Sequence, residues 1–163
     1  MHASITPTDE QVFFADDEII VSKTDLKGRI VYANQTFCKV ASFAEHEVVG
    51  QPHSIIRHPD MPRAIFKLLW DTLRAEREIF AYVKNITKTG AYYWVFAHVT
   101  PSRDKSGAVV GYHSNRRTPR QDVIANVIAP LYAQILREEK AHRNGQQALA
   151  AGSSAVDGFL RSR

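Results

Sequence analysis

The chain has 163 residues, of which 44% are hydrophobic and 23% charged, a composition typical of one folded domain that excludes disordered and fibrous proteins. No stretch reaches the roughly 18 to 20 apolar residues of a membrane-spanning helix and residues 1–8 lack the features of a signal peptide, so we expect a cytoplasmic protein without membrane insertion. The net charge of +4 is spread over separated lysines and arginines, Arg57 and Arg116 among them; we interpret it as solvated surface and expect no nucleic-acid binding.

The first part of the chain predicts β structure behind a polar N-terminal cap, residues 1–18. β-Branched residues at 19–21 predict a first strand, and residues 29–32 predict a second. Because residues 25–28 have turn chemistry, the two strands are expected to pair as a hairpin.

A helical region follows the hairpin. Residues 34–40 and 44–49 predict two short helices. A longer helix begins at Asp60 or Met61, with Pro62 in its first turn. Its apolar face is predicted from positions at helical spacing, namely Ile65, Leu68, Leu69, Thr72 and Leu73.

The second half of the chain predicts a three-stranded meander and an exit helix. The strands cover residues 80–86, 92–100 and 109–116, and turn residues separate them. A helix opening at Pro119 is expected to be kinked at Pro130. Its predicted apolar stripe consists of Val123, Val127, Leu131 and Ile135.

This order of elements predicts an α+β fold, in which a five-stranded antiparallel sheet carries helices on one face. The expected organisation is an N-terminal cap at 1–18, a folded domain at 19–118, a C-terminal helix at 119–143 and a flexible tail at 144–163.

Two stretches carry a resemblance to a known family. Residues 24–34, read as TDLKGRIVYAN, resemble the opening of PAS domains. Residues 50–62, read as GQPHSIIRHPDMP, resemble the hallmark of the flavin-binding PAS domain of bacterial aerotaxis receptors, and Lys84-Asn85 continues the match. The chain is most similar to stand-alone PAS subunits of bipartite energy-taxis systems. This resemblance implies a PAS fold, bound FAD and output to a chemoreceptor or other signalling protein, with a homodimer as a further possibility.

The residues suit such a cofactor. Asn85 shares a strand face with Ala81 and Val83, so its amide can pair with the edge of a flavin ring. Arg57 and His58 precede a helix start, where a phosphate is favoured. The expected cofactor-binding residues are Asn34, Arg57, His58, Asp60, Trp70 and Asn85.

Three of these residues have an alternative structural role. Asn34 and Asp60 are both suited to capping a helix, and for Asp60 that role is as well supported as cofactor contact. Trp70 can pack over the flavin or complete the hydrophobic core.

Some residues of the chain also bear on functions other than that of a flavin sensor. His98 and His113 can ligate haem iron, which makes a haem-binding PAS gas sensor the chief rival. The single cysteine, Cys38, lacks the sequence setting of a flavin-adduct photoreceptor and is interpreted as packed and inert. No catalytic arrangement or metal cluster is evident, so we expect no enzyme activity. The remaining alternative is a cofactor-free PAS adaptor that mediates assembly.

Overall fold

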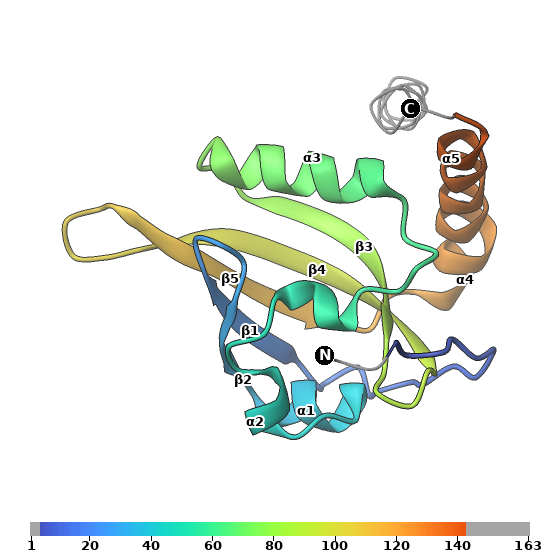
Figure 1. Cartoon of the computed structure of the whole chain (residues 1–163), viewed down its shortest axis with the longest axis horizontal. Helices are drawn as coiled ribbons and strands as arrows, with labels where there is room; N and C mark the ends of the chain where they lie inside the picture. The colour runs from blue at the N-terminus through green and yellow to red at the C-terminus, as the bar shows by residue number, and fades with distance from the viewer. Residues whose placement is uncertain (1–3, 143–163) are drawn as a thin grey trace.

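The computed structural model describes residues 4–142, and it contains one five-stranded antiparallel sheet with the order β2-β1-β5-β4-β3 (Figure 1). The predicted α+β arrangement is therefore confirmed. The tail expected at 144–163 lies outside the described residues. The strands are β1 (Ile20–Asp25), β2 (Ile30–Ala33), β3 (Ile79–Ile86), β4 (Tyr92–Arg103) and β5 (Val109–Arg117).

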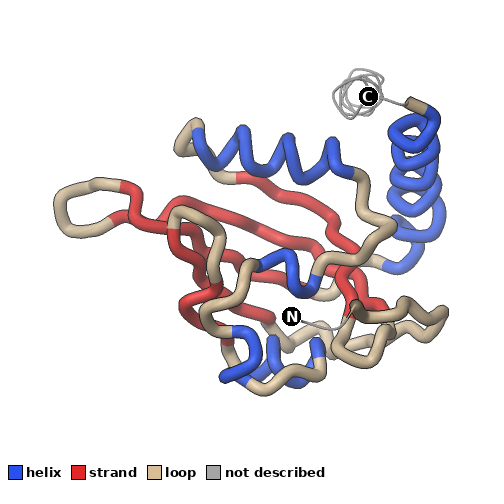
Figure 2. Tube along the Cα trace, viewed as in Figure 1, coloured by secondary structure: helices blue, strands red, loops and turns tan. Residues whose placement is uncertain are grey.

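The helices connect β2 to β3 or follow β5. Figure 1 shows α3 running along the sheet, with α5 standing beside one end of α3 and α1 and α2 at the opposite side of the molecule. Figure 2 shows that the segments between the short helices are irregular. The helices are α1 (Gln35–Ala41), α2 (Glu45–Val48), the 3-10 helix η1 (His53–Ile56), α3 (Arg63–Arg74), α4 (Gln121–Val123), the π turn η2 (Ile124–Ile128) and α5 (Ala129–Ala141). None of the helices in this part of the chain is long and apolar enough to cross a membrane.

The first hairpin forms at the predicted turn. The Asp25 carboxylate accepts hydrogen bonds from the backbone N–H groups of Lys27 and Arg29, at 2.9 and 3.0 Å. Gly28 has a positive φ of 79°, a conformation that residues with a side chain rarely adopt. The turn is thus fixed by an aspartate and a glycine, as its composition indicated.

The hydrophobic core lies between the helices and the inner face of the sheet. Phe37 of α1, Val48 of α2, Ile56 of η1, Leu73 of α3 and Val95 of β4 are almost completely buried in it. Since short helices are marginal in isolation, these contacts are what hold α1, α2 and η1 in place.

The start of α3 differs from the prediction. The helix begins at Arg63, because Pro62 precedes it in an extended conformation, and Asp60 makes no cap. The first backbone N–H groups instead donate to a carboxylate from α5: Glu139 accepts from Arg63 at 3.0 Å and from Ala64 at 2.9 Å. A side chain 75 residues away thus satisfies the helix end, which local sequence could not indicate.

The predicted stripe of α3 is only partly buried. Ile65, Leu69 and Leu73 face the core, whereas Leu68 is 41% exposed. The Thr72 hydroxyl donates to the backbone carbonyl of Leu68 instead of meeting the core. The burial surface is therefore narrower than the sequence pattern indicated.

The exit helix buries a different stripe from the one predicted. The fully buried residues of η2 and α5 are Ile124, Ile128, Tyr132, Ile135 and Glu139, whereas Val123, Val127 and Leu131 of the predicted stripe are partly buried and packed against the core. The π turn η2 directly precedes α5, and Pro130 lies in the first turn of α5. The buried positions include one three-residue step, from Tyr132 to Ile135, whereas the predicted stripe used four-residue steps throughout.

Residues before β1 lie against the β3–β4 connection. The Thr8 N–H donates to the Gly90 carbonyl at 2.9 Å, and the Val12 N–H donates to the Tyr92 carbonyl at 2.8 Å. The Tyr92 N–H in turn donates to Glu10. This N-terminal segment therefore covers the turn at which β4 begins.

Candidate functional site

A cavity of about 400 Å³ lies between the inner face of the sheet and the helices. We call it the ring cavity. Its volume is within the range of small-molecule sites, and its wall combines apolar side chains with a few polar groups. The residues that line it include Ser22, Thr24, His53, Arg57, Phe66, Trp70, Val83, Asn85, Ala97, Tyr112 and Arg116.

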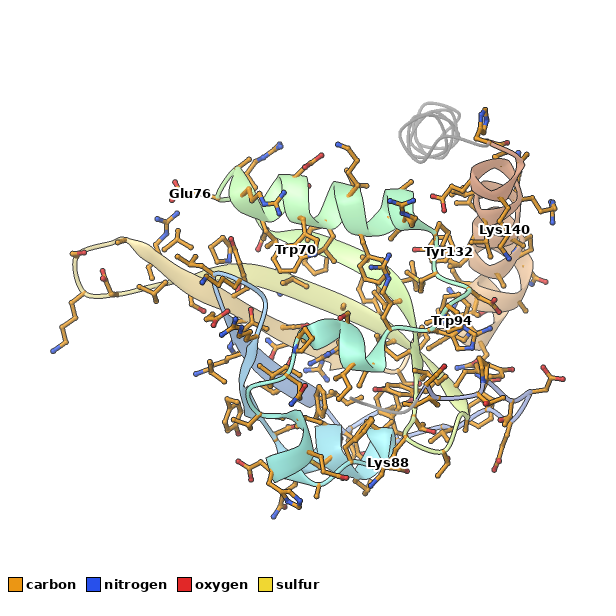
Figure 3. The ribbon with its side chains drawn as sticks, viewed as in Figure 1. Trp70, Glu76, Lys88, Trp94, Tyr132 and Lys140 are labelled. Atoms are coloured by element: carbon orange, nitrogen blue, oxygen red, sulfur yellow. The ribbon has the colours of Figure 1, made fainter. Side chains whose placement is uncertain are left out.

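Trp70 and its neighbours form an apolar wall of the ring cavity. Figure 3 shows Trp70 directed from α3 into the space above the sheet. Its ring makes an edge-to-face contact with Tyr112 of β5, with centroids 5.4 Å apart. A Cβ atom at Gly28 would lie only 3.2 Å from the Trp70 ring. The glycine turn, Trp70 and Tyr112 therefore form one packed group beside the ligand space.

Asn85 lies at a polar part of the cavity wall. It is 3% exposed and pairs in register with Tyr93 of β4, which is 1% exposed. Burial raises the pKa of the Tyr93 hydroxyl, and a nearby Arg116 charge and a hydrogen bond with Asn85 partly oppose this effect. Asn85, Tyr93 and Arg116 are thus close enough to influence one another.

Arg116 contradicts the interpretation of the positive charge as surface. Its side chain is only 2% exposed and lines the ring cavity. Two buried polar side-chain atoms of the described residues lack a hydrogen-bond partner, Thr24 Oγ1 and Arg116 Nε, and both residues belong to this cavity wall. Because unmatched buried polar groups are rare and unfavourable, the cavity suits a ligand that carries polar atoms.

A second cavity of about 450 Å³ adjoins the ring cavity at Arg57, which lines both. We call it the basic cavity, since His58 and Arg63 also line it. The Arg57 guanidinium lies 3.7 Å from the centre of the Phe66 ring. Burial and the neighbouring Arg63 charge lower the pKa of Arg57, while Glu139 acts in the opposite direction. Together these groups suit an anionic part of a ligand.

His58 is held in a defined orientation. It is 3% exposed, and its Nδ1 accepts a hydrogen bond from the Asp60 backbone N–H at 3.0 Å. Burial and Lys84 lower its pKa below the ordinary value, against the opposing effect of the Asp60 carboxylate. A neutral His58 in this arrangement carries its proton on Nε2, which leaves that atom as a donor.

Two predicted site residues lie outside both cavity walls. Asn34 has its capping role: its side-chain oxygen accepts from Phe37 N–H at 2.9 Å and from Val21 N–H at 3.1 Å, while its amide donates to the Ile19 carbonyl. Asp60 is exposed and pairs with Lys84 at 3.3 Å. The structure thus brings Arg57, Trp70 and Asn85 to one cavity and His58 to the adjoining one.

The two histidines considered for haem lie away from the ring cavity. His98 of β4 stacks on Phe80 with centroids 4.2 Å apart and bonds to Glu78. His113 of β5 bonds to Asn115. Cys38 of α1 is also absent from the ring cavity wall, and burial raises the pKa of its thiol.

Sequence reasoning missed several residues of the cavity wall, chiefly Ser22, His53 and Arg116. Arg116 carried a usable signal, because it alternates with Tyr112 and Ser114 on one face of β5. His53 lies in the 50–62 stretch but has no distinguishing pattern of its own. Its position in the wall depends on η1, which only the fold reveals.

Comparison with known proteins identifies a family over most of the sheet and helices. Residues 30–116 match the family described as "PAS fold". The aerotaxis receptor of Escherichia coli is 40% identical over 125 residues, which is 77% of this chain and 24% of the receptor. A nitrogen fixation regulatory protein of Klebsiella oxytoca is 25% identical over 61% of this chain and 20% of its own length. The chain therefore spans about a quarter or less of the curated relatives that it matches.

Solved structures show the same fold. A light-oxygen-voltage domain studied with a flavin analogue aligns with a TM-score of 0.60 at 22% identity, covering 69% of this chain and 84% of that one. The dark-state light-oxygen-voltage domain of the photoreceptor Aureochrome1 aligns with a TM-score of 0.59 at 18% identity, covering 75% and 84%. At these identities the likeness concerns the fold alone.

Proposed function

The chain belongs to the PAS family, and from this premise we propose that it is a redox or oxygen sensor for energy taxis that binds FAD without a covalent bond. The observation that carries the proposal is the pair of adjoining cavities joined at Arg57, one with apolar walls and a polar region, the other basic. A flavin would supply reversible electron-transfer chemistry, and the protein would bind and orient it.

The ring cavity fits the flavin ring. Val83, Ala97 and Trp70 offer apolar surface for its faces, and Asn85 offers both a donor and an acceptor for the polar edge of the ring. Thr24 and Arg116 bring polar atoms that have no protein partner. This combination of apolar walls and few polar groups is the usual composition of a cofactor site.

The basic cavity favours FAD over FMN. A ring in the first cavity with its chain passing Arg57 would bring phosphate groups to Arg57, His58 and Arg63. Glu139 satisfies the N-terminus of α3, so the phosphates are expected at these side chains and not at the helix end. An adenosine attached beyond the phosphates would occupy the space bordered by Ser4 and Ile5.

The output of the sensor is proposed from the 40% identity with an aerotaxis receptor. We infer a cytoplasmic signalling role without enzyme activity, in which the chain contacts a chemoreceptor or other signalling protein, with a homodimer as a further form. A change in charge at the flavin would alter its contacts with Asn85 of β3. This strand also contacts the exit helix, since the Tyr132 hydroxyl donates to the Tyr82 carbonyl at 2.7 Å.

Mass spectrometry of the ligand released by denaturation tests the proposal directly, and FAD is the expected product. Hydrogen exchange should then differ between oxidised and dithionite-reduced protein around Asn85 and in α5. Haem in place of a flavin would support the gas-sensor alternative. Its iron ligand would then be a residue other than His98 or His113, since neither lines the ring cavity. A colourless protein after cofactor-supplemented expression would support the adaptor alternative.

Arg57→Ala should weaken FAD binding much more than riboflavin binding. Charge-assisted hydrogen bonds contribute about 1.5 to 3 kcal/mol, which corresponds to a loss of roughly 10-fold to 150-fold in affinity. Riboflavin has no phosphate and should lose little. Titration of stripped protein with both ligands measures the difference, and Arg77→Ala, at an exposed arginine outside both cavity walls, serves as the control. Equal losses for the two ligands would contradict the phosphate role.

A further inference from the structure

Arg116 is a buried cation without an anionic partner. Its side chain is 2% exposed on the inner face of β5, and none of the ion pairs found between residues 4 and 142 includes it. Its guanidinium lies 5.3 Å from the centre of the Phe37 ring. A buried charge without a counterion is strongly unfavourable, so its presence calls for a compensating group.

The groups around Arg116 do not neutralise it. Its Nη1 donates to His53 Nε2 at 3.1 Å, and its Nη2 donates to the Ser22 hydroxyl. A histidine nitrogen that accepts from a guanidinium is unprotonated, so His53 is neutral here. Ser22 also lies within hydrogen-bonding distance of His53, at 3.2 Å. The cluster therefore orients the guanidinium but leaves its full charge, with Nε unpaired.

Electrostatic effects agree with this geometry. Burial lowers the pKa of Arg116 to about 10, against the opposing charge effect of Tyr93. The guanidinium remains charged at neutral pH. Burial and Arg116 itself lower the pKa of His53 to about 3, which keeps the imidazole neutral.

The position of Arg116 connects it with Asn85. Arg116 pairs in register with Ala97 of β4, whose side chain lines the ring cavity. The Tyr93 hydroxyl is influenced both by Arg116 and by a hydrogen bond with Asn85. The unpaired cation therefore belongs to the same polar region of the wall that is expected to face the edge of the bound ring.

We propose that Arg116, oriented by Ser22 and His53, binds the ligand ring by donating hydrogen bonds to a carbonyl or another negatively polarised group at the edge of the ring. In the ligand-free protein the same buried charge lowers the stability of the fold. The identification of this ring as a flavin rests on the proposed function. The general inference concerns any ligand with a hydrogen-bond acceptor at that edge, because the guanidinium has donors and no acceptor.

The test compares Arg116→Met with Arg117→Met in the full chain after non-covalent ligand has been stripped. Arg117 is the next residue of β5 and is exposed, so its replacement makes the same charge change outside the cavity. Replacing a buried ion pair by apolar side chains of similar volume is often neutral or stabilising, and a buried charge without a counterion is less favourable than a pair. We expect Arg116→Met to keep or raise the Tm of the ligand-free protein.

The same variant should lose affinity for both FAD and riboflavin, by roughly tenfold or more, since each presents the same ring edge. This distinguishes Arg116 from Arg57, whose replacement affects FAD selectively. Arg117→Met should leave both affinities unchanged. A lowered Tm in Arg116→Met, or unchanged flavin affinity, would overturn the inference and assign Arg116 a structural role.

The proposed function and this inference can fail separately. If the unsubstituted chain binds neither FAD nor riboflavin, the flavin assignment is wrong, and the Tm comparison then decides the inference. A Tm of Arg116→Met equal to or above that of the unsubstituted chain would support a binding role toward another acceptor-bearing ligand, whereas a lower Tm would refute it.

Discussion

Ala97→Phe is expected to abolish flavin loading while the protein remains folded. Ala97 is 2% exposed on the inner face of β4, between Ala81 of β3 and Arg116 of β5 in the register of the sheet. Its side chain borders the cavity of about 400 Å³, so a phenylalanine ring can enter space that is already present. Overpacking destabilises a close-packed core by about 1 to 3 kcal/mol, but here the new ring replaces the ligand.

Flavin content per protein, from the ratio of flavin to protein absorption, measures this effect. We expect a decrease on the order of tenfold or more, because the ring and the new side chain compete for one space. His98→Ala is the matched control, since His98 is the next residue of β4 and faces the other side of the sheet, where it stacks on Phe80. Normal flavin content in Ala97→Phe would show that the cofactor lies elsewhere.

The sequence allowed the fold to be predicted where local chemistry determines structure. The Asp25–Gly28 turn forms as expected because its hydrogen bonds and its positive φ depend on residues within the turn. Asn34 caps α1 for the same reason. The meander of β3, β4 and β5 follows from alternating β-branched and aromatic residues, and the structure places it within a few residues of the predicted bounds.

The errors arose where distant contacts determine structure. The first N–H groups of α3 donate to Glu139 of α5 and not to a local cap such as Asp60, and no local pattern encodes that contact. The exit helix buries Ile124 and Ile128 more deeply than Val123 and Val127, because its buried face includes one three-residue step, from Tyr132 to Ile135. The predicted stripe used four-residue steps throughout, whereas the face of a helix with 3.6 residues per turn combines steps of three and four.

Part of the candidate site could be predicted, where the family resemblance or the alternation of side chains along a strand indicated a residue. Arg57, Trp70 and Asn85 were expected from the family resemblance and from strand alternation, and all three line the ring cavity. Arg116 was interpreted as surface because charged side chains are seldom buried without a partner. The burial of Arg116 is informative, since a charged residue that is buried without a counterion is a candidate for a functional role.

His53 is expected to make the stability of the protein depend strongly on acid pH. Its pKa is about 3 in the folded protein, lowered by burial and by Arg116, against an ordinary value of 6.5. Between these two values the unfolded chain binds a proton at His53 and the folded protein does not. Unfolding is therefore favoured as pH falls, and the stability present above pH 6.5 is lost progressively toward pH 3.

His53→Gln should remove this dependence, because the amide does not titrate and its oxygen can still accept from Arg116. One proton corresponds to a slope of at most about 1.4 kcal/mol per pH unit in the free energy of unfolding.

Urea unfolding across this pH range measures the slope in the unsubstituted chain and in the variant. Carboxylates with lowered pKa values, such as those of Glu18, Glu47 and Asp104, contribute equally to both and cancel in the difference. His58→Gln is the comparison variant, since the pKa of His58 is lowered in the same direction. Parallel pH profiles for His53→Gln and the unsubstituted chain would mean that His53 is accessible to protons within the folded cavity, and that water or ligand polar groups solvate its charged form there.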